Sequence, residues 1–450
     1  MAANPFVYKA EELGTVGAML KRILSVATGM LLGSVLALGA ARLSAVLGFW
    51  PTSEADRAMS QMRDVLRLVS ENYVEDKPVE YTALTKAALR GVVGSLDPHS
   101  DFLERRDYRT LQEDMSNEFG GIGIQVERRE KRVVVIAPIA GTPGERAGIL
   151  RGDEIISVDG EVFEEASMDA VVSRLRGRPR TEVTVGFHRP DTGKDFVVTL
   201  TREIIKLESV ADVRMIENEI GYVRLTQFSE RTGEEFLRAL DRLNNEGMTS
   251  LILDLRNNPG GLLNAAVEVA EPFFNRNELV VYTQGRRASD REEFRAGTTT
   301  PPLKLPVAVL VNAGSASAAE IVAGALKDTE RAVIVGERSF GKGSVQSIFR
   351  LRDGEALRLT TARYYTPSGI TIHEKGIDPH VEVVMTPEED GKVRLQRARD
   401  DLKDPEEFKR RFGFEPIEDR QLQAAVDVLR ASRLMQERLR QTSPGTLGTN

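Results

Sequence analysis

The carboxyl-terminal half of the chain alternates short apolar segments with helical patterns, and this alternation restricts its fold more than any other feature. From residue 204 onward the segments GYVRLTQF, SLILDLR, VAVLVNAG and AVIVGE read as strands, and helices are predicted at 232–245, 263–273 and 318–328. Several of these strands are apolar throughout, as expected where helices cover both faces of a sheet. Residues 204–390 are therefore expected to form an α/β core.

A chain of 450 residues exceeds one ordinary domain, so two or three domains are expected. Residues 107–203 contain short β-rich segments such as RVVVIAPI and TEVTVGF, with helices predicted at 143–147 and 167–175. Strands at this spacing predict a separate module of about 90 residues. Residues 391–450 are expected to form a polar helical region, with an amphipathic helix at 419–439 and a disordered tail.

The N-terminal part of the chain is expected to be helical. Residues 23–41 are an uncharged run of 19 residues, which as a helix spans roughly 28 Å, close to the ~30 Å hydrocarbon thickness of a bilayer. We expect an uncleaved membrane anchor there, after an N-terminal segment of residues 1–22; a cleaved signal peptide and a buried core helix are the alternatives. The flanking positive charges favour an exported body at the periplasmic or extracytoplasmic face of the inner membrane. Residues 50–105 are expected to serve partner packing or homo-oligomer formation, or to be a helical spacer.

The composition excludes several classes of function. A net charge of −7 and a pI near 5.5 argue against nucleic-acid binding, which usually shows a basic surface. The chain has no cysteine, which removes disulfides, thiolate metal sites and a cysteine nucleophile. Its four histidines form no HExxH pair, so a catalytic zinc site has no visible ligand set. No metal or cofactor is therefore expected.

A candidate nucleophile follows one of the apolar strands, in NAGSASAAEIVAGALK. Ser317 is expected at the N-terminus of a helix, where unpaired N–H groups and the helix dipole favour developing negative charge. The backbone N–H of Ala318 is then a candidate donor to an oxyanion hole. Ser315 is the competing nucleophile, and a plain N-cap serine is the alternative interpretation.

A candidate base lies in the glycine-rich segment GERSFGKGSVQ. An ordinary lysine has a pKa near 10.4 and is a poor base at neutral pH, but burial of a lysine can lower that pKa and make a neutral amine available. Lys342 is therefore the candidate base. A solvated surface lysine is the alternative. A phosphate-binding loop of the form GxxxxGK[ST] is excluded, because Gly343 stands where that pattern needs serine or threonine.

The segment GGIGIQV, followed by APIAGTPGERAGILRGDEIISVDG, resembles a PDZ domain over residues 107–203. The resemblance implies a glycine-rich loop that binds a peptide's terminal carboxylate and a strand to which the peptide adds. Its matching residues are Gly121, Ile122, Gly123 and Ile124, and the partners implied are proteins or peptides with exposed C-terminal tails. A β-turn without a ligand is the alternative.

Together with GSASAAE, FGKGSVQ, DLRNNPGG and ARYYTPSG, this module strongly resembles the carboxyl-terminal processing peptidases, or tail-specific serine proteases. The resemblance covers residues 55–384. It implies a multidomain α/β protein with an α-helical N-terminal element, a PDZ domain and a crotonase-like/ClpP-like α/β serine protease core. It also implies an endopeptidase that recognises an apolar C-terminal tail through the PDZ domain.

By the same resemblance Ser317 is the nucleophile, Lys342 is its general base, and Gln346 assists or orients the lysine. DLRNNPGG supplies a second oxyanion-hole N–H at Gly261 or Gly260; we prefer Gly261, but the sequence does not decide between them. Acyl transfer through serine is the implied mechanism.

Other interpretations stay open at this point. His373 is a rival base, and Arg176 is a candidate gating residue. Arg180 departs from the family pattern, which often has glycine there, and this puts peptide preference or gating in doubt. A membrane-tethered PDZ scaffold with an inactive core is the alternative function, and a crotonase-like acyl-CoA enzyme is the third.

Overall fold

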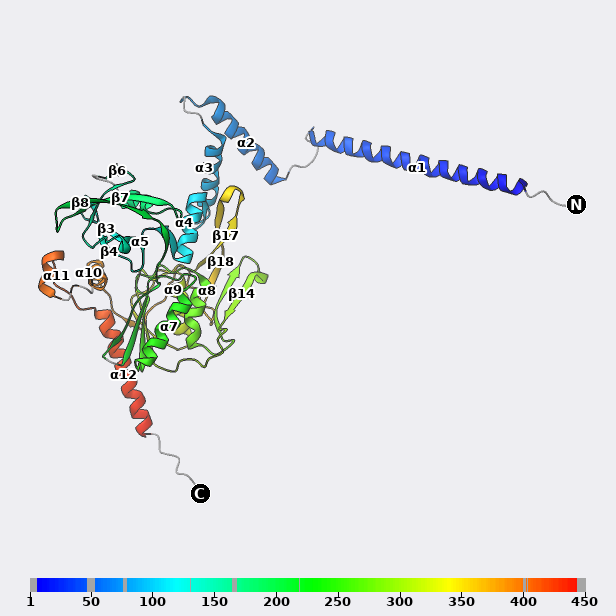
Figure 1. The fold of residues 1–450 in the computed structure, drawn as a ribbon. Coiled ribbons are helices and arrows are strands. Elements are labelled where there is room, and N and C mark those ends of the chain that lie inside the picture. The colour runs from blue at the N-terminus through cyan, green and yellow to red at the C-terminus, as the bar shows by residue number, and fades with distance from the viewer. Residues whose placement is uncertain are drawn as a thin grey trace, which may run out of the picture. The chain divides into compact units, whose positions relative to one another are not determined.

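The computed structural model describes most of the chain and divides into two compact units, Met1–Val92 and Val93–Asn450 (Figure 1). The described residues are 6–46, 53–75, 79–129, 131–163, 168–217, 219–399, 402 and 404–442. The expected disordered tail therefore falls largely on residues 443–450, outside the described residues, as do residues 1–5 of the expected N-terminal segment.

Helices make up the first unit. α1 (Phe6–Val46) covers the apolar run at 23–41, and α2 (Glu54–Asn72) begins at a capping box between Ser53 and Asp56. Along the part of the chain that is described, no helix combines the length and apolarity that crossing a membrane requires. The membrane anchor stays a prediction.

The α/β core in the second unit is built on a six-stranded sheet in the order β10-β11-β12-β15-β16-β19. Its neighbours pair in parallel except β10 and β11. The strands are β10 (Val210–Ile216), β11 (Ile220–Leu225), β12 (Ser250–Asp254), β15 (Val307–Val311), β16 (Val333–Gly336) and β19 (Val381–Glu382).

Helices cover both faces of this sheet, as the apolar strands predict. One face packs under α7 (Thr232–Asn245), α8 (Leu263–Ala270) and α9 (Ala318–Asp328). The other face packs under α12 (Arg420–Thr442), as Figure 1 shows in red. Side chains alternate along a strand, so Leu251 joins the first cluster and Ile252 the second. The predicted α/β core is confirmed.

A second, antiparallel sheet adjoins the core, and the sequence analysis missed it. β17 and β18 form a hairpin within it, and β18 also pairs with β1 and β13. Arginine and threonine interrupt the apolar pattern of β18, which hides the strand period. The strands are β1 (Asp101–Leu103), β13 (Leu279–Gly285), β14 (Arg291–Arg295), β17 (Ser344–Arg350) and β18 (Ala356–Tyr365).

The β-rich module has its own apolar core and a sheet in the order β3-β4-β5-β7-β8, with β6 (Glu161–Val162) beside β5. The expected first residue of the module, residue 107, lies inside a helix that was not predicted, α4 (Arg105–Ser116). The strands are β3 (Ile124–Arg129), β4 (Arg132–Pro138), β5 (Glu154–Val158), β7 (Glu182–Arg189) and β8 (Lys194–Thr201). Two helices, α5 (Pro143–Arg146) and α6 (Met168–Leu175), complete it, and β2 (Glu118–Gly121) pairs with β9 (Glu203–Lys206) beside it.

A buried ionic cluster attaches the C-terminal region to the core. Arg256, which follows β12, donates hydrogen bonds through its guanidinium to Asp254 and to both carboxylate oxygens of Asp419, at 2.7 and 2.9 Å. Arg256 and Asp254 are fully buried, and the ion pair holds the pKa of Asp254 well below its usual range. α10 (Pro387–Ala398) and α11 (Pro405–Phe412) precede α12, so the expected boundary between residues 390 and 391 lies inside α10.

Arg180 adopts a backbone conformation that favours glycine. Its φ is 69°, in the left-handed region, and its N–H donates to the carbonyl oxygen of Arg202 at 2.7 Å. A side chain in this conformation is strained, because its Cβ approaches neighbouring backbone atoms. The exposed arginine therefore stands where glycine fits better.

We predict that Arg180→Gly raises the free energy of unfolding by about 0.5–1 kcal/mol, since relief of strain exceeds the entropy cost of glycine. Arg178→Gly is the control, because Arg178 lies in the same loop without a positive φ and its replacement should destabilise by a similar amount. Urea unfolding of both variants measures the difference. Equal destabilisation by the two substitutions would contradict a strained Arg180.

Candidate active site

Three adjacent parallel strands bring the predicted catalytic segments to one edge of the core sheet. β12, β15 and β16 are neighbours, and residues at their carboxyl ends pair in register: Asp254 with Leu310, and Val311 with Gly336. The segment after β12 holds DLRNNPGG, the turn after β15 holds Ser317, and the loop after β16 holds Lys342. Carboxyl ends of parallel strands are where open α/β sheets bind ligands.

Ser317 sits at the junction between the turn and α9. It is the N-cap of the helix, with φ 54° and ψ −113°, and only 6% of its surface is exposed. A positive φ at a residue other than glycine is strained and persists where the surroundings fix it. The other candidate serine, Ser315, is fully buried; its hydroxyl donates to Leu255 O at 2.8 Å and accepts the N–H of Asn312 at 3.0 Å.

Lys342 lies in a tightly packed loop. A Cβ on Gly343 would overlap the backbone nitrogen of His373, so only glycine fits beside the lysine. Burial lowers the pKa of Lys342, and the charge of Arg358 lowers this pKa further, while Glu320 opposes both. Its Nζ has no hydrogen-bond partner among the described residues. The surroundings therefore favour the neutral amine.

Glu320 joins the serine turn to the lysine loop, and the sequence analysis did not assign it a role. Its buried Oε1 accepts the hydroxyl of Ser339 at 2.6 Å and the N–H of Gly341 at 2.7 Å. Its Oε2 accepts the N–H of Ser317 at 2.8 Å and the N–H of Lys342 at 2.9 Å. The two catalytic candidates thus meet at one oxygen atom. The glutamate of GSASAAE, at the third position of the helix, was the available signal.

The glycines of DLRNNPGG abut the serine turn. A Cβ on Gly260 would lie 2.7 Å from Ser317 Cβ and 2.8 Å from the nitrogen of Ala318. The N–H of Gly260 is already donated to Asn258 Oδ1 at 2.9 Å. Within the described chain the N–H groups of Gly261 and Ala318 have no partner. Two donors of an oxyanion hole would have this arrangement.

Tyr364, on β18, is a further neighbour of Ser317 that the sequence analysis missed. Burial raises the pKa of Tyr364 to about 12, and a hydrogen bond with the Ser317 side chain partly opposes this rise. The phenol therefore stays protonated at neutral pH. Nothing in ARYYTPSG distinguishes this tyrosine from its neighbour, because its proximity depends on a sheet that the sequence did not reveal.

Gln346 lies on β17 and contacts its own sheet rather than Lys342. Its amide nitrogen donates to Ser344 Oγ at 2.9 Å and to Thr360 Oγ1 at 3.4 Å. Thr360 in turn donates to Asp97 Oδ1 at 3.2 Å. The rival base His373 has a buried Nδ1 without a partner among the described residues.

The peptide-binding residues of the β-rich module lie between β2 and β3. Gly123 has φ 72°, and a side chain there would overlap Thr142. Its carbonyl oxygen accepts the N–H of Ile139, and that of Ile122 accepts the N–H of Gly144. β3, which begins at Ile124, is an edge strand of the sheet. Arg176, the candidate gating residue, stacks on Phe119 at 4.2 Å beside this module.

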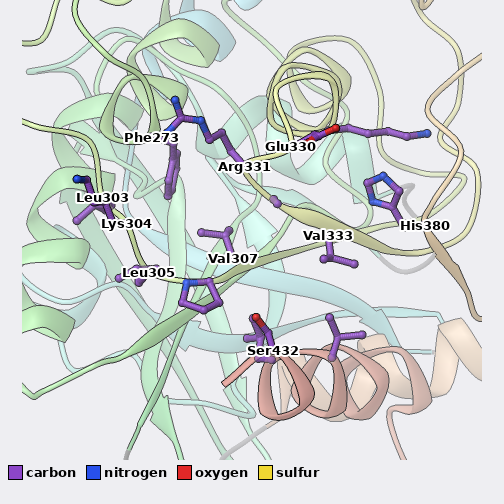
Figure 2. A pocket seen from close by; sticks show the side chains of 15 residues that line it. Phe273, Leu303, Lys304, Leu305, Val307, Glu330, Arg331, Val333, His380 and Ser432 are labelled. Carbon is purple, nitrogen blue, oxygen red and sulfur yellow. The ribbon is translucent and has the colours of Figure 1, made fainter. Parts of the chain in front are cut away.

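A separate cavity of about 600 Å³ lies away from Ser317 and Lys342, neither of which lines it. Figure 2 shows the strand residues Val307 and Val333 between Arg331 on one side and Ser432 of α12 on the other. The described residues contain no group of three or more acidic or histidine side chains that could hold a metal ion.

Comparison with known proteins assigns both parts of the second unit. Residues 219–383 match the model of peptidase family S41, and residues 134–189 match a PDZ domain. The carboxy-terminal-processing protease of Bartonella bacilliformis is 38% identical over 73% of this chain and 75% of its own length. The carboxy-terminal processing protease CtpB of Bacillus subtilis is 33% identical over 74% of this chain and 69% of its own length.

Among solved structures, a photosystem II D1 C-terminal processing protease aligns with 31% identity and a TM-score of 0.44, over 74% of this chain and 94% of that one. The two sequence relatives carry the assignment, since each covers more than two thirds of the related protein. The chain belongs to the carboxy-terminal-processing serine proteases of peptidase family S41, and it carries a PDZ domain.

Proposed function

We propose that this protease is an endopeptidase in which Ser317 is the nucleophile and Lys342 its general base. The observation that carries the proposal is the shared carboxylate oxygen of Glu320, which accepts the backbone N–H groups of both residues. The lowered pKa of Lys342 supports it, because a base at neutral pH must be unprotonated. Ser315 is a weaker candidate, since its buried hydroxyl is already donated to Leu255 O.

The proposed reaction is an acyl transfer. The neutral amine of Lys342 takes the proton of Ser317 Oγ, which attacks the peptide carbonyl. The N–H groups of Ala318 and Gly261 donate hydrogen bonds to the developing oxyanion. Gly261 is preferred over Gly260 because the N–H of Gly260 is already donated to Asn258 Oδ1. The lysine ammonium then protonates the leaving amine, and water releases the acyl-enzyme.

Formation of the dyad requires a side-chain movement. In the described chain no hydrogen bond joins Lys342 Nζ to Ser317 Oγ, and the serine hydroxyl interacts with Tyr364 instead. Catalytic hydrogen bonds are often long before substrate binds, and the flexible stem of lysine allows its amine to turn. Gln346 lies on β17, the strand that follows the lysine loop, and its amide now donates to Ser344 and Thr360. We assign it the role of orienting the lysine after the amine has turned toward Ser317.

We predict that Ser317→Ala and Lys342→Ala each lower kcat by at least about 10³-fold, as loss of a nucleophile or its base does in other serine enzymes. Cleavage of a reporter protein with an apolar C-terminal tail measures this, with the exposed Lys304→Ala as control. Both variants should still bind the tail peptide. Turnover by Ser317→Ala at the wild-type rate would contradict the assignment, and unchanged turnover by Lys342→Ala would exclude this lysine as the base. Tail-peptide binding without cleavage by the wild-type protein would favour a scaffold role.

We further propose that the PDZ domain selects substrates by their C-terminal tail. Supporting this, Ile122 and Gly123 have backbone N–H groups without partners among the described residues. The adjacent edge strand β3 is open to a further strand. A terminal carboxylate bound by these N–H groups, with the tail paired to β3, satisfies both features.

Amidation of the tail's terminal carboxylate is predicted to weaken peptide binding about 10- to 100-fold, because charge-assisted hydrogen bonds of roughly 1.5–3 kcal/mol are lost. Isothermal titration of Ser317→Ala protein with free-acid and amidated peptides measures this. N-acetylation of the same peptide is the control and should leave the affinity unchanged. Equal affinity for the acid and the amide would exclude carboxylate recognition.

A further inference from the structure

The charge of Glu320 is held by hydrogen bonds rather than by a cation. No lysine, arginine or histidine of the described chain forms an ion pair with its carboxylate, although the side chain is fully buried. Burying a carboxylate costs several kcal/mol unless its oxygens are fully bonded. Burial raises the pKa of Glu320, and four donors, three of them backbone N–H groups, offset part of this rise.

These donors come from two separate segments of chain. The N–H of Ser317 belongs to the turn before α9, where it completes a capping box with Glu320. The N–H groups of Gly341 and Lys342 are consecutive, and together they form a concave anion-binding nest in the loop after β16. The carboxylate therefore spans both loops, whereas an ordinary capping box stays within one helix.

The hydroxyl of Ser339 extends the connection to a third segment. It donates to Glu320 Oε1 at 2.6 Å and accepts the N–H of Ile377 at 2.7 Å. The segment that contains Ile377 also packs against the lysine loop, since a Cβ on Gly343 would overlap His373. The lysine loop is thus held by Glu320, which connects it to the serine turn, and by the segment that contains His373 and Ile377.

We propose that Glu320 is a positioning residue that fixes the serine turn against the lysine loop, and so sets the geometry for proton transfer from Ser317 to Lys342. The proposal rests on the proposed Ser317/Lys342 dyad. A neutral side chain cannot replace Glu320, because an amide has one acceptor oxygen and its NH₂ group would face N–H donors. A displacement of about 1 Å between reacting groups can lower a rate about 10²-fold.

The test is Glu320→Gln, measured against Glu389→Gln. Glu389 forms the same capping box with Thr386 at the start of α10, so it controls for the loss of a helix cap. We expect Glu320→Gln to lower kcat about 10²-fold, with KM changed less than about threefold and tail-peptide affinity unchanged. Labelling of Ser317 by a fluorophosphonate probe should slow by the same factor as kcat. Glu389→Gln should leave all of these values unchanged.

The pH profile separates positioning from simple structural support. The charge of Glu320 raises the pKa of Lys342 relative to its other surroundings. Removing the charge lowers this pKa, so the acid limb of kcat/KM should move to lower pH in Glu320→Gln. Glu320→Asp keeps the negative charge but has a side chain one methylene shorter. It should therefore return the acid limb of kcat/KM to its wild-type pH, while kcat stays low because the two loops are no longer held together.

The outcomes distinguish this inference from the proposed dyad. If Ser317→Ala remains active, the dyad itself is wrong. If Ser317→Ala is inactive while folded Glu320→Gln keeps the wild-type kcat, labelling rate and pH profile, the role of Glu320 is overturned. If Glu320→Gln does not fold, Ser339→Ala decides, because it removes one donor: a two- to tenfold loss in kcat, of the order of one hydrogen bond, supports the inference, and an unchanged kcat overturns it.

Discussion

The carboxylate of Glu320 is the point at which the two halves of the proposed catalytic apparatus meet. Parallel pairing of β15 with β16 delivers the serine turn and the lysine loop to the same sheet edge, but strand pairing alone does not fix loops to within a hydrogen bond. Four donors on one buried carboxylate do so. Because an unsatisfied buried charge is costly, the loops can separate only by exposing or protonating Glu320. Packing of the core sheet therefore brings the serine turn and the lysine loop near each other, and the hydrogen bonds to the charged Glu320 carboxylate set their relative position.

The same surroundings shape the chemistry of the lysine. Burial and Arg358 disfavour the ammonium, whereas Glu320 favours it, and the balance leaves the pKa below that of an ordinary lysine. Tyr364 keeps its proton and interacts with the Ser317 side chain. The described chain therefore places the Tyr364 phenol near the serine side chain, and Lys342 Nζ has no hydrogen-bond partner among the described residues. In the proposed mechanism, substrate binding would bring the Lys342 amine to the Ser317 hydroxyl.

The sequence predicted the features that depend on local residue patterns. It missed the features that arise only when distant segments of the chain meet in the fold. Apolar strands predicted the α/β core, and quoted motifs predicted the protease family and PDZ domain, all of which are confirmed. Two adjacent glycines gave no basis in the sequence for choosing between Gly260 and Gly261; the proposed choice of Gly261 rests on the hydrogen bond from the Gly260 N–H to the Asn258 side chain. Glu320 and Tyr364 had ordinary positions in a helix and a strand, and their importance arises only when distant segments meet. The polar helix α4 was missed because few apolar residues mark its period.

The most direct test of the account is the pKa of the Lys342 amine in the folded protein. Lysine labelled with ¹³C at Cε reports protonation by NMR, and comparison with Lys342→Ala assigns the signal. The account predicts titration clearly below the ordinary value of about 10.4, because burial and Arg358 disfavour the charged amine. A Lys342 that titrates at or above that value would be charged at neutral pH and could not take the proton of Ser317, which would contradict the account.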